Sequence, residues 1–165
     1  MTGAAGDAAL LLSIGLLCVR RIGVAMVLCA LQAVSAAASF CAMRPSMALL
    51  GLALNGIALP LAIIRAERTT LAAGKDLVAW LPAIAVPVAS AELLTGPVAA
   101  GMSVVLLGLL LALRSPAAPE IGFLSSQNGL VLVGAAHPDL PLSAAVAVAL
   151  PLLPALLVAN AWLRR

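Results

Sequence analysis

Aromatic and charged residues are scarce in this chain of 165 residues. The sequence contains no Tyr, two Phe and two Trp, and only 9% of its residues are charged. A soluble domain has about a quarter of its residues charged, because it must cover its surface with polar side chains. The composition therefore excludes a soluble globular domain. The shortage of Trp and Tyr also removes the aromatic belt that marks both membrane interfaces in many membrane proteins.

Residues that bind metals or carry out nucleophilic chemistry are also few. The sequence has one histidine, His137, and three cysteines, Cys18, Cys29 and Cys41. Their spacing matches no metal-ligand motif, and there is no glycine-rich phosphate loop or nucleophile–base pair. We therefore predict that the chain has no catalytic residues and carries no metal or cofactor itself. The net charge of +3 lies at the ends of apolar segments, so it indicates membrane topology and not nucleic-acid binding.

Long apolar segments occupy most of the chain. Hydrophobic residues make up 64% of the sequence, and the mean hydropathy is +1.21. A membrane-spanning helix needs about 20 mostly apolar residues. The sequence predicts an all-α fold, a polytopic bundle of about seven transmembrane helices in one membrane domain over residues 1–165. Little sequence remains for a soluble domain that could bind a nucleotide, a haem or an iron–sulfur cluster. The predicted spans are 4–19, 22–43, 46–64, 77–94, 97–113, 120–136 and 142–163.

Basic residues fall mainly on one side of this seven-span arrangement. Eight of the nine lie on that side, and Arg44 alone lies on the other. Cytoplasmic loops carry an excess of Lys and Arg, so we predict that the N-terminus is outside and the C-terminus inside the bacterial inner membrane. Whether the short first segment is fully inserted stays open. The eight residues are Arg20, Arg21, Arg65, Arg68, Lys75, Arg114, Arg164 and Arg165.

Proline and glycine bear on how these helices bend and pack. Pro82 and Pro87 fall within 77–94, and Pro151 and Pro154 within 142–163, so we expect both helices to be kinked. No two glycines lie four residues apart, so the close-packing motif GxxxG is absent. Alanines give 142–163 a surface of small residues instead.

Uncharged polar side chains near the middle of the spans are the candidate functional site. Amides cost free energy in hydrocarbon unless they find partners, so we expect them to face the interior of the bundle. Two interpretations stay open: the amides join helices through hydrogen bonds, or they line a path for water and protons. No carboxylate lies deep in a predicted span, which argues against a proton relay. The candidate residues are Gln32, Ser35, Asn55, Ser125, Gln127 and Asn128.

Three stretches share a pattern with known membrane subunits. Residues 20–39 (RRIGVAMVLCALQAVSAAAS) form a basic turn followed by a segment bearing Gln and Ser, and in 55–64 (NGIALPLAII) a polar residue precedes Pro-Leu. Residues 106–134 contain a leucine-rich segment, a short basic loop and Gln127-Asn128-Gly129. Together these stretches resemble component E of hydrogenase-4 and the related subunit of formate hydrogenlyase. The C-terminal half is also similar to the K (chain 4L) subunit of complex I and the C subunit of multi-subunit cation/proton antiporters.

The resemblance implies partners, and the departures from it limit the function. It implies antiporter-like membrane subunits, a soluble hydrogenase or dehydrogenase arm, and the surrounding bilayer, with no nucleic acid. The Glu of the family's Glu-Asn-Gly motif is Gln127 here, which keeps the shape but loses the charge. The family often has a lysine near the position of Asn55 and acids in its last helix, and neither is present here. We therefore expect weak or no intrinsic proton transfer.

Three hypotheses of function follow. The first is a non-catalytic membrane subunit of a hydrogenase-4-like or complex I-like, redox-linked ion-translocating complex, bridging antiporter-like subunits. The second is an independent small transporter or channel, in which the proline-containing spans 77–94 and 142–163 form a gate. The third is a purely structural membrane scaffold in which the amides only fix helix packing.

Overall fold

The part of the chain that the structure describes is helical. The computed structural model describes residues 2–19, 21–41, 49, 51–58, 60–61, 81–114 and 119–136, and no strand occurs among them. The all-α prediction is therefore confirmed for these residues. The predicted span 142–163 lies outside them, and the spans 22–43, 46–64 and 77–94 are described only in part. The helices are α1 (Thr2–Cys18), α2 (Ile22–Cys41), the π-helix η1 (Leu52–Ala58), α5 (Leu81–Leu93), α6 (Gly96–Arg114) and α7 (Pro119–Ala136).

Helix boundaries follow local backbone chemistry. Gly96 has a φ of +56°, a conformation that favours glycine, and it turns the chain from α5 into α6. Pro97 follows in the first turn of α6, and Pro119 is the first residue of α7. Proline is tolerated there because the first amides of a helix have no partner within it. Pro87 lies inside α5, where it cannot donate a backbone hydrogen bond to the carbonyl four residues earlier.

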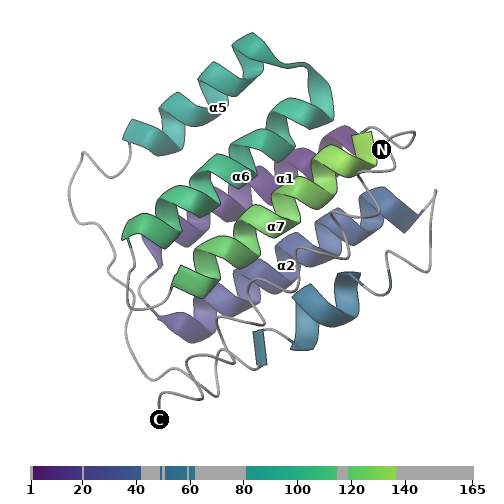
Figure 1. Ribbon diagram of the computed structural model, residues 1–165, viewed down its shortest axis with the longest axis vertical. Helices are drawn as coiled ribbons and strands as arrows, with labels where there is room; N and C mark the ends of the chain where they lie inside the picture. The colour runs from purple at the N-terminus through teal and green to yellow at the C-terminus, as the bar shows by residue number, and fades with distance from the viewer. Residues whose placement is uncertain are drawn as a thin grey trace.

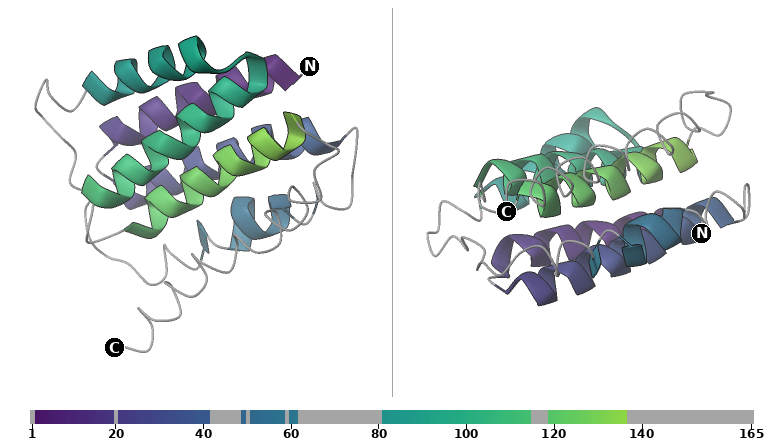
Figure 2. Two further views of the ribbon diagram at one scale, coloured as in Figure 1. Left: turned by 45° about the horizontal axis from the view of Figure 1, so that its top comes forward. Right: turned by 60° about the horizontal axis from the view of Figure 1, so that its bottom comes forward.

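The helices form two layers. One layer contains α1, α2 and η1, and the other contains α5, α6 and α7 (Figure 2). Between the layers, α1 packs on α6 and α2 packs on α7, while α5 lies at one edge beside α6 (Figure 1). Only three residues separate α1 from α2, which suits an antiparallel pair of neighbours.

The closest helix pair is α6 with α7, and glycines make this contact possible. A methyl group on Gly129 would lie 2.7 Å from both the carbonyl oxygen of Gly101 and the backbone nitrogen of Val105. On the other side of the pair, a methyl group on Gly108 would lie 2.6 Å from the backbone nitrogen of Ser126. The glycines on each helix are seven residues apart, at 101 and 108 on α6 and at 122 and 129 on α7. The two backbones therefore meet along two turns of helix.

Buried amides lie among the apolar residues of the core of this bundle. Gln32, Gln127 and Asn128 have exposed fractions of 0%, 2% and 1%. Large apolar side chains lie on the outside instead, with Leu93 exposed by 82% and Leu113 by 81%. Buried amides together with many exposed large apolar side chains are unusual in a soluble protein.

Two described helices are long and apolar enough to cross a membrane. They are residues 22–39 of α2 and the whole of α6, while α1 and α5 are apolar but shorter. Helix α7 has the length but not the hydropathy, because Glu120 and the polar run Ser125–Asn128 interrupt it. Membrane association is thus weakly supported by these two helices.

Candidate functional site

Four consecutive polar residues of α7 are buried. They are Ser125, Ser126, Gln127 and Asn128, with exposed fractions between 1% and 5%. Successive residues on an α-helix point about 100° apart, so four in a row cover the whole circumference. Helix α7 is therefore enclosed on every side at this level, which agrees with its packing on both α6 and α2.

Three amides from two helices form a continuous hydrogen-bonded chain. The Nε2 of Gln127 donates to Oδ1 of Asn55 at 3.0 Å, and Nδ2 of Asn55 donates to Oδ1 of Asn128 at 3.4 Å. The Nδ2 of Asn128 in turn donates to the backbone carbonyl oxygen of Cys29 at 3.2 Å. This amide cluster, defined as Asn55, Gln127 and Asn128, links η1, α7 and α2.

The π-helix η1 supplies the central member of the amide cluster. Asn55 has an exposed fraction of 3%, and both the oxygen and the nitrogen of its side-chain amide form hydrogen bonds within the cluster. π-Helices are rare in proteins, and those that do occur often lie at functional sites. Here η1 packs on α2, and Asn55 reaches from it to α7.

The amide cluster contributes to stability chiefly because its members would otherwise lie unpaired in an apolar interior. An interhelical hydrogen bond of this kind contributes about 0.6–2 kcal/mol in a bilayer. Leaving one of these polar groups unpaired costs about 1–3 kcal/mol. Among the described residues, only Oε1 of Gln127 in this cluster has no hydrogen-bond partner.

Gln32 belongs to a second, separate cluster. Its Nε2 donates to the hydroxyl oxygen of Ser13 at 2.7 Å and to the carbonyl oxygen of Ala9 at 3.3 Å. Ser13 itself donates to the same carbonyl of Ala9 at 3.0 Å. This α1–α2 cluster joins the first two helices, so the structure does not bring Gln32 together with Asn55 and Gln127.

The predicted hydroxyl residues differ in their surroundings. Ser35 is half-buried and donates to the carbonyl of Leu31 in its own helix at 3.2 Å, so it lies outside both clusters. Ser125 is buried, and its hydroxyl has no hydrogen-bond partner in the described part of the chain. Ser126 was not among the predicted site residues, yet it donates to the carbonyl oxygens of Val105 and Gly122, both at 3.0 Å. It thereby fastens α7 to α6.

Sequence reasoning also missed Ser13 and the burial of Glu120. Ser13 lies in a short apolar segment, and only its hydrogen bond with Gln32 in the structure identifies it as part of a polar cluster. Glu120 lies in the first turn of α7 with an exposed fraction of 7%, and its Oε2 has no hydrogen-bond partner among the described residues. The helix dipole favours a carboxylate at the N-terminus of a helix. This preference is the one sequence feature that could have predicted the position of Glu120 in the first turn.

The arrangement can hold helices together but offers little acid–base chemistry. Amides do not titrate near neutral pH. Among the described residues, no three His, Cys, Asp or Glu side chains come together as a metal site. His137 lies outside the described residues.

No family model, no curated protein and no solved structure matches this chain.

Proposed function

We propose that this chain is a non-catalytic, multi-pass membrane subunit of a hydrogenase-4-like or complex I-like redox-linked complex. In this proposal it crosses the bacterial inner membrane seven times, with its N-terminus outside and its C-terminus inside. It bridges antiporter-like subunits, while a soluble hydrogenase or dehydrogenase arm performs the redox chemistry.

The observation that carries the proposal is the pairing of buried amides with an apolar exterior. A bundle that hides Asn55, Gln127 and Asn128 and exposes Leu93 and Leu113 suits a hydrocarbon environment. The sequence resemblance around Gln127-Asn128-Gly129 supports the kind of complex that we propose.

The amide cluster supports a bridging role and argues against an independent proton path. Its three members satisfy most of one another's hydrogen-bonding groups, and none of them titrates near neutral pH. The cluster therefore fixes the positions of α2, η1 and α7, and the partner subunits move most of the ions.

Affinity purification tests the proposal directly. The full chain, tagged and expressed at native level, is isolated from its own membranes in mild detergent and analysed by mass spectrometry. An unrelated tagged multi-pass protein from the same membranes serves as the control. We expect enrichment of a large antiporter-like subunit and of a hydrogenase-type or dehydrogenase-type catalytic subunit. Recovery of the chain alone, with ion flux by the purified chain in liposomes, would instead indicate an independent transporter.

A further inference from the structure

An open groove separates α5 from α1 on the edge of the bundle. Its volume is about 400 Å³, which lies within the range of roughly 300–1,000 Å³ typical of small-molecule sites. Helix α1 contributes Asp7 and Leu10 to its walls, and α5 contributes Pro87 and Ala91. The turn between α5 and α6 and the first half of α6 form the floor. The remaining lining residues are Leu94, Thr95, Gly96, Ala99, Ala100 and Ser103.

Small side chains keep the groove open. Ala91 on α5 faces it together with Ala99 and Ala100 on α6, and none of the three extends beyond a methyl group. Helix α5 packs on α6 but has little contact with α1, so no large side chain of the described residues closes the space between α5 and α1. The N-terminal end of α1 and the α5–α6 turn lie at the same end of the bundle (Figure 1).

The groove carries the charge of Asp7 at this end, and its other described lining residues are uncharged and mostly apolar, apart from Thr95 and Ser103. Asp7 is exposed and is the one charged residue in the described lining. Arg21 follows the opposite end of α1, and Arg114 ends α6 at its far end. A complementary ligand therefore has a cationic group beside a long apolar part.

We propose that this groove binds a phospholipid with a primary ammonium head group, phosphatidylethanolamine, an inference that rests on the membrane location proposed above. The ammonium lies at Asp7, and an acyl chain follows Leu10, Ala91 and Pro87, which lie farther along α1 and α5 from that end. A primary ammonium can donate hydrogen bonds to a carboxylate, whereas the quaternary ammonium of phosphatidylcholine cannot. The hydroxyl of Thr95, which lines the same groove, can donate to the adjacent phosphate.

Matched variants test the head-group preference. The full chain is reconstituted in vesicles that contain spin-labelled phosphatidylethanolamine, phosphatidylcholine or phosphatidylglycerol, and the immobilised fraction is measured. We expect phosphatidylethanolamine to be selected, and Asp7→Asn to reduce its relative affinity about two- to fivefold, the range for an exposed ion pair. Glu92→Gln removes an equal charge from an exposed residue of α5 outside the groove, so it should change nothing. Equal effects of the two variants, or a preference for phosphatidylglycerol, would overturn the proposal.

A second pair of variants tests the apolar part of the groove. Ala91→Leu fills the groove from an exposed position of α5, whereas Ala89→Leu adds the same bulk at an exposed position outside it. Only Ala91→Leu should lower the immobilised fraction for every head group, and equal effects would count against an acyl chain in the groove. Alkaline extraction separates this proposal from the proposed function. A chain released from membranes by carbonate contradicts both, while a chain that stays inserted without selecting phosphatidylethanolamine contradicts the groove alone.

Discussion

Gln127 and Asn55 depend on each other for a hydrogen bond that an apolar neighbour cannot replace. The donor is Nε2 of Gln127 and the acceptor is Oδ1 of Asn55, at 3.0 Å. Both side chains are buried, so the loss of one leaves a polar atom of the other unpaired in the interior.

Gln127→Leu should therefore destabilise the bundle by about 1–3 kcal/mol and impair its assembly. Gln127→Glu should be milder, since a neutral carboxylic acid keeps the shape and can donate its O–H to Asn55. Thermal unfolding in detergent measures both variants. Ser35→Ala is the control, because that hydroxyl bonds only within its own helix and should change the midpoint little. Equal midpoints for the Leu and Glu variants would contradict a hydrogen-bonded Gln127.

Ser125 offers the opposite test at the residue scale. Its hydroxyl is buried without a partner among the described residues, so its removal relieves a desolvation cost. We expect Ser125→Ala to leave the unfolding midpoint unchanged or raise it. Ser126→Ala should lower the midpoint, because it breaks the hydrogen bond to Val105 that joins α7 to α6. A lower midpoint for Ser125→Ala would show that this hydroxyl has a partner after all.

The sequence predicted single polar residues better than it predicted their partners. Gln127, Asn128 and Asn55 stand out because amides are costly in an apolar segment, and they do come together. The partner of Gln32 could not be predicted, because Ser13 is a small hydroxyl residue that apolar helices tolerate anywhere. Which hydroxyl meets which amide depends on the rotation of α1 against α2, and local sequence does not set that rotation.

At the scale of helices, the contact between α6 and α7 depends on the absence of side chains. Ser126 adds a hydrogen bond across this contact, but the close approach itself comes from Gly101, Gly108, Gly122 and Gly129. Small residues at a helix interface allow close backbone packing in membranes, where no hydrophobic effect drives association.

Gly129→Ala should weaken this contact by about 1–3 kcal/mol, because the new methyl group meets backbone atoms that cannot move aside. Gly23→Ala on α2 is the matched control. Apart from its chain neighbours and its own helix backbone, no atom of the described residues lies within 4 Å of its added methyl group, so it should be neutral or slightly stabilising through helix propensity. Chemical denaturation of both variants provides the measurement, and equal stabilities would contradict the close approach.

Helix positions were predictable, while helix contacts were not. The ends of α2, α6 and α7 lie close to the predicted segments, because charges, prolines and glycines interrupt the apolar sequence there. A search for glycines four residues apart overlooked the contact between α6 and α7, whose glycines recur every seven residues. Seven residues complete nearly two helical turns, so this spacing also keeps glycines on one face. The π-helical winding of η1 has no signal in composition or periodicity.

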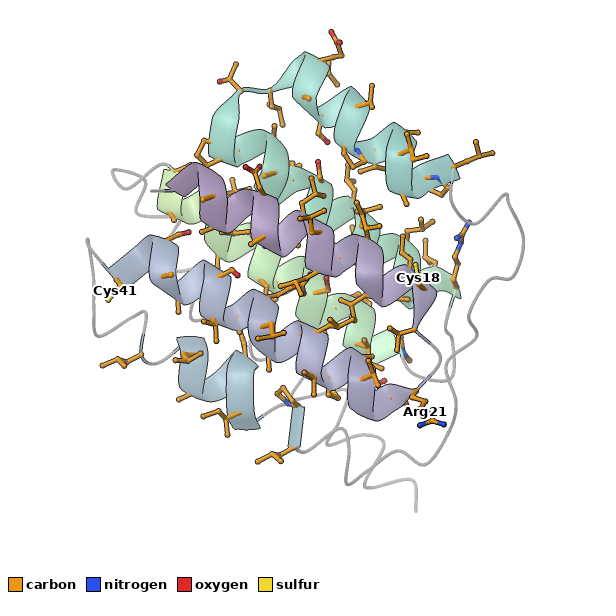
Figure 3. All side chains as sticks on the ribbon, turned by 180° about the vertical axis from the view of Figure 1, so that it is seen from behind. Cys18, Arg21 and Cys41 are labelled. Carbon is orange, nitrogen blue, oxygen red and sulfur yellow. The ribbon has the colours of Figure 1, made fainter. Side chains whose placement is uncertain are left out.

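At the scale of the whole molecule, the three cysteines test the proposed orientation. Cys18 and Cys41 are exposed at opposite ends of the bundle, and Arg21 lies at the same end as Cys18 (Figure 3). Cys29, which lies between them in the sequence, is fully buried. If the N-terminus is outside, Cys41 faces outward and Cys18 faces the cytoplasm.

Single-cysteine variants in intact spheroplasts should therefore react differently with a membrane-impermeant maleimide. Cys41 should react at once, Cys18 only after the membrane is permeabilised, and Cys29 only after denaturation. Reaction of Cys18 before Cys41 would reverse the orientation, and equal reaction of both in intact spheroplasts would contradict a membrane-spanning α2, the helix that separates them.

The backbone contact between α6 and α7 also has a consequence for motion. Two helices joined glycine to glycine cannot slide or rotate past each other, so they move as one rigid body, to which Ser126 adds a further tether. Among the described helices α5 has no comparable attachment, since α6 is its main neighbour and α5 lies at the edge of its layer. Any large motion within the described bundle should therefore be a rotation of α5 about a hinge at Gly96.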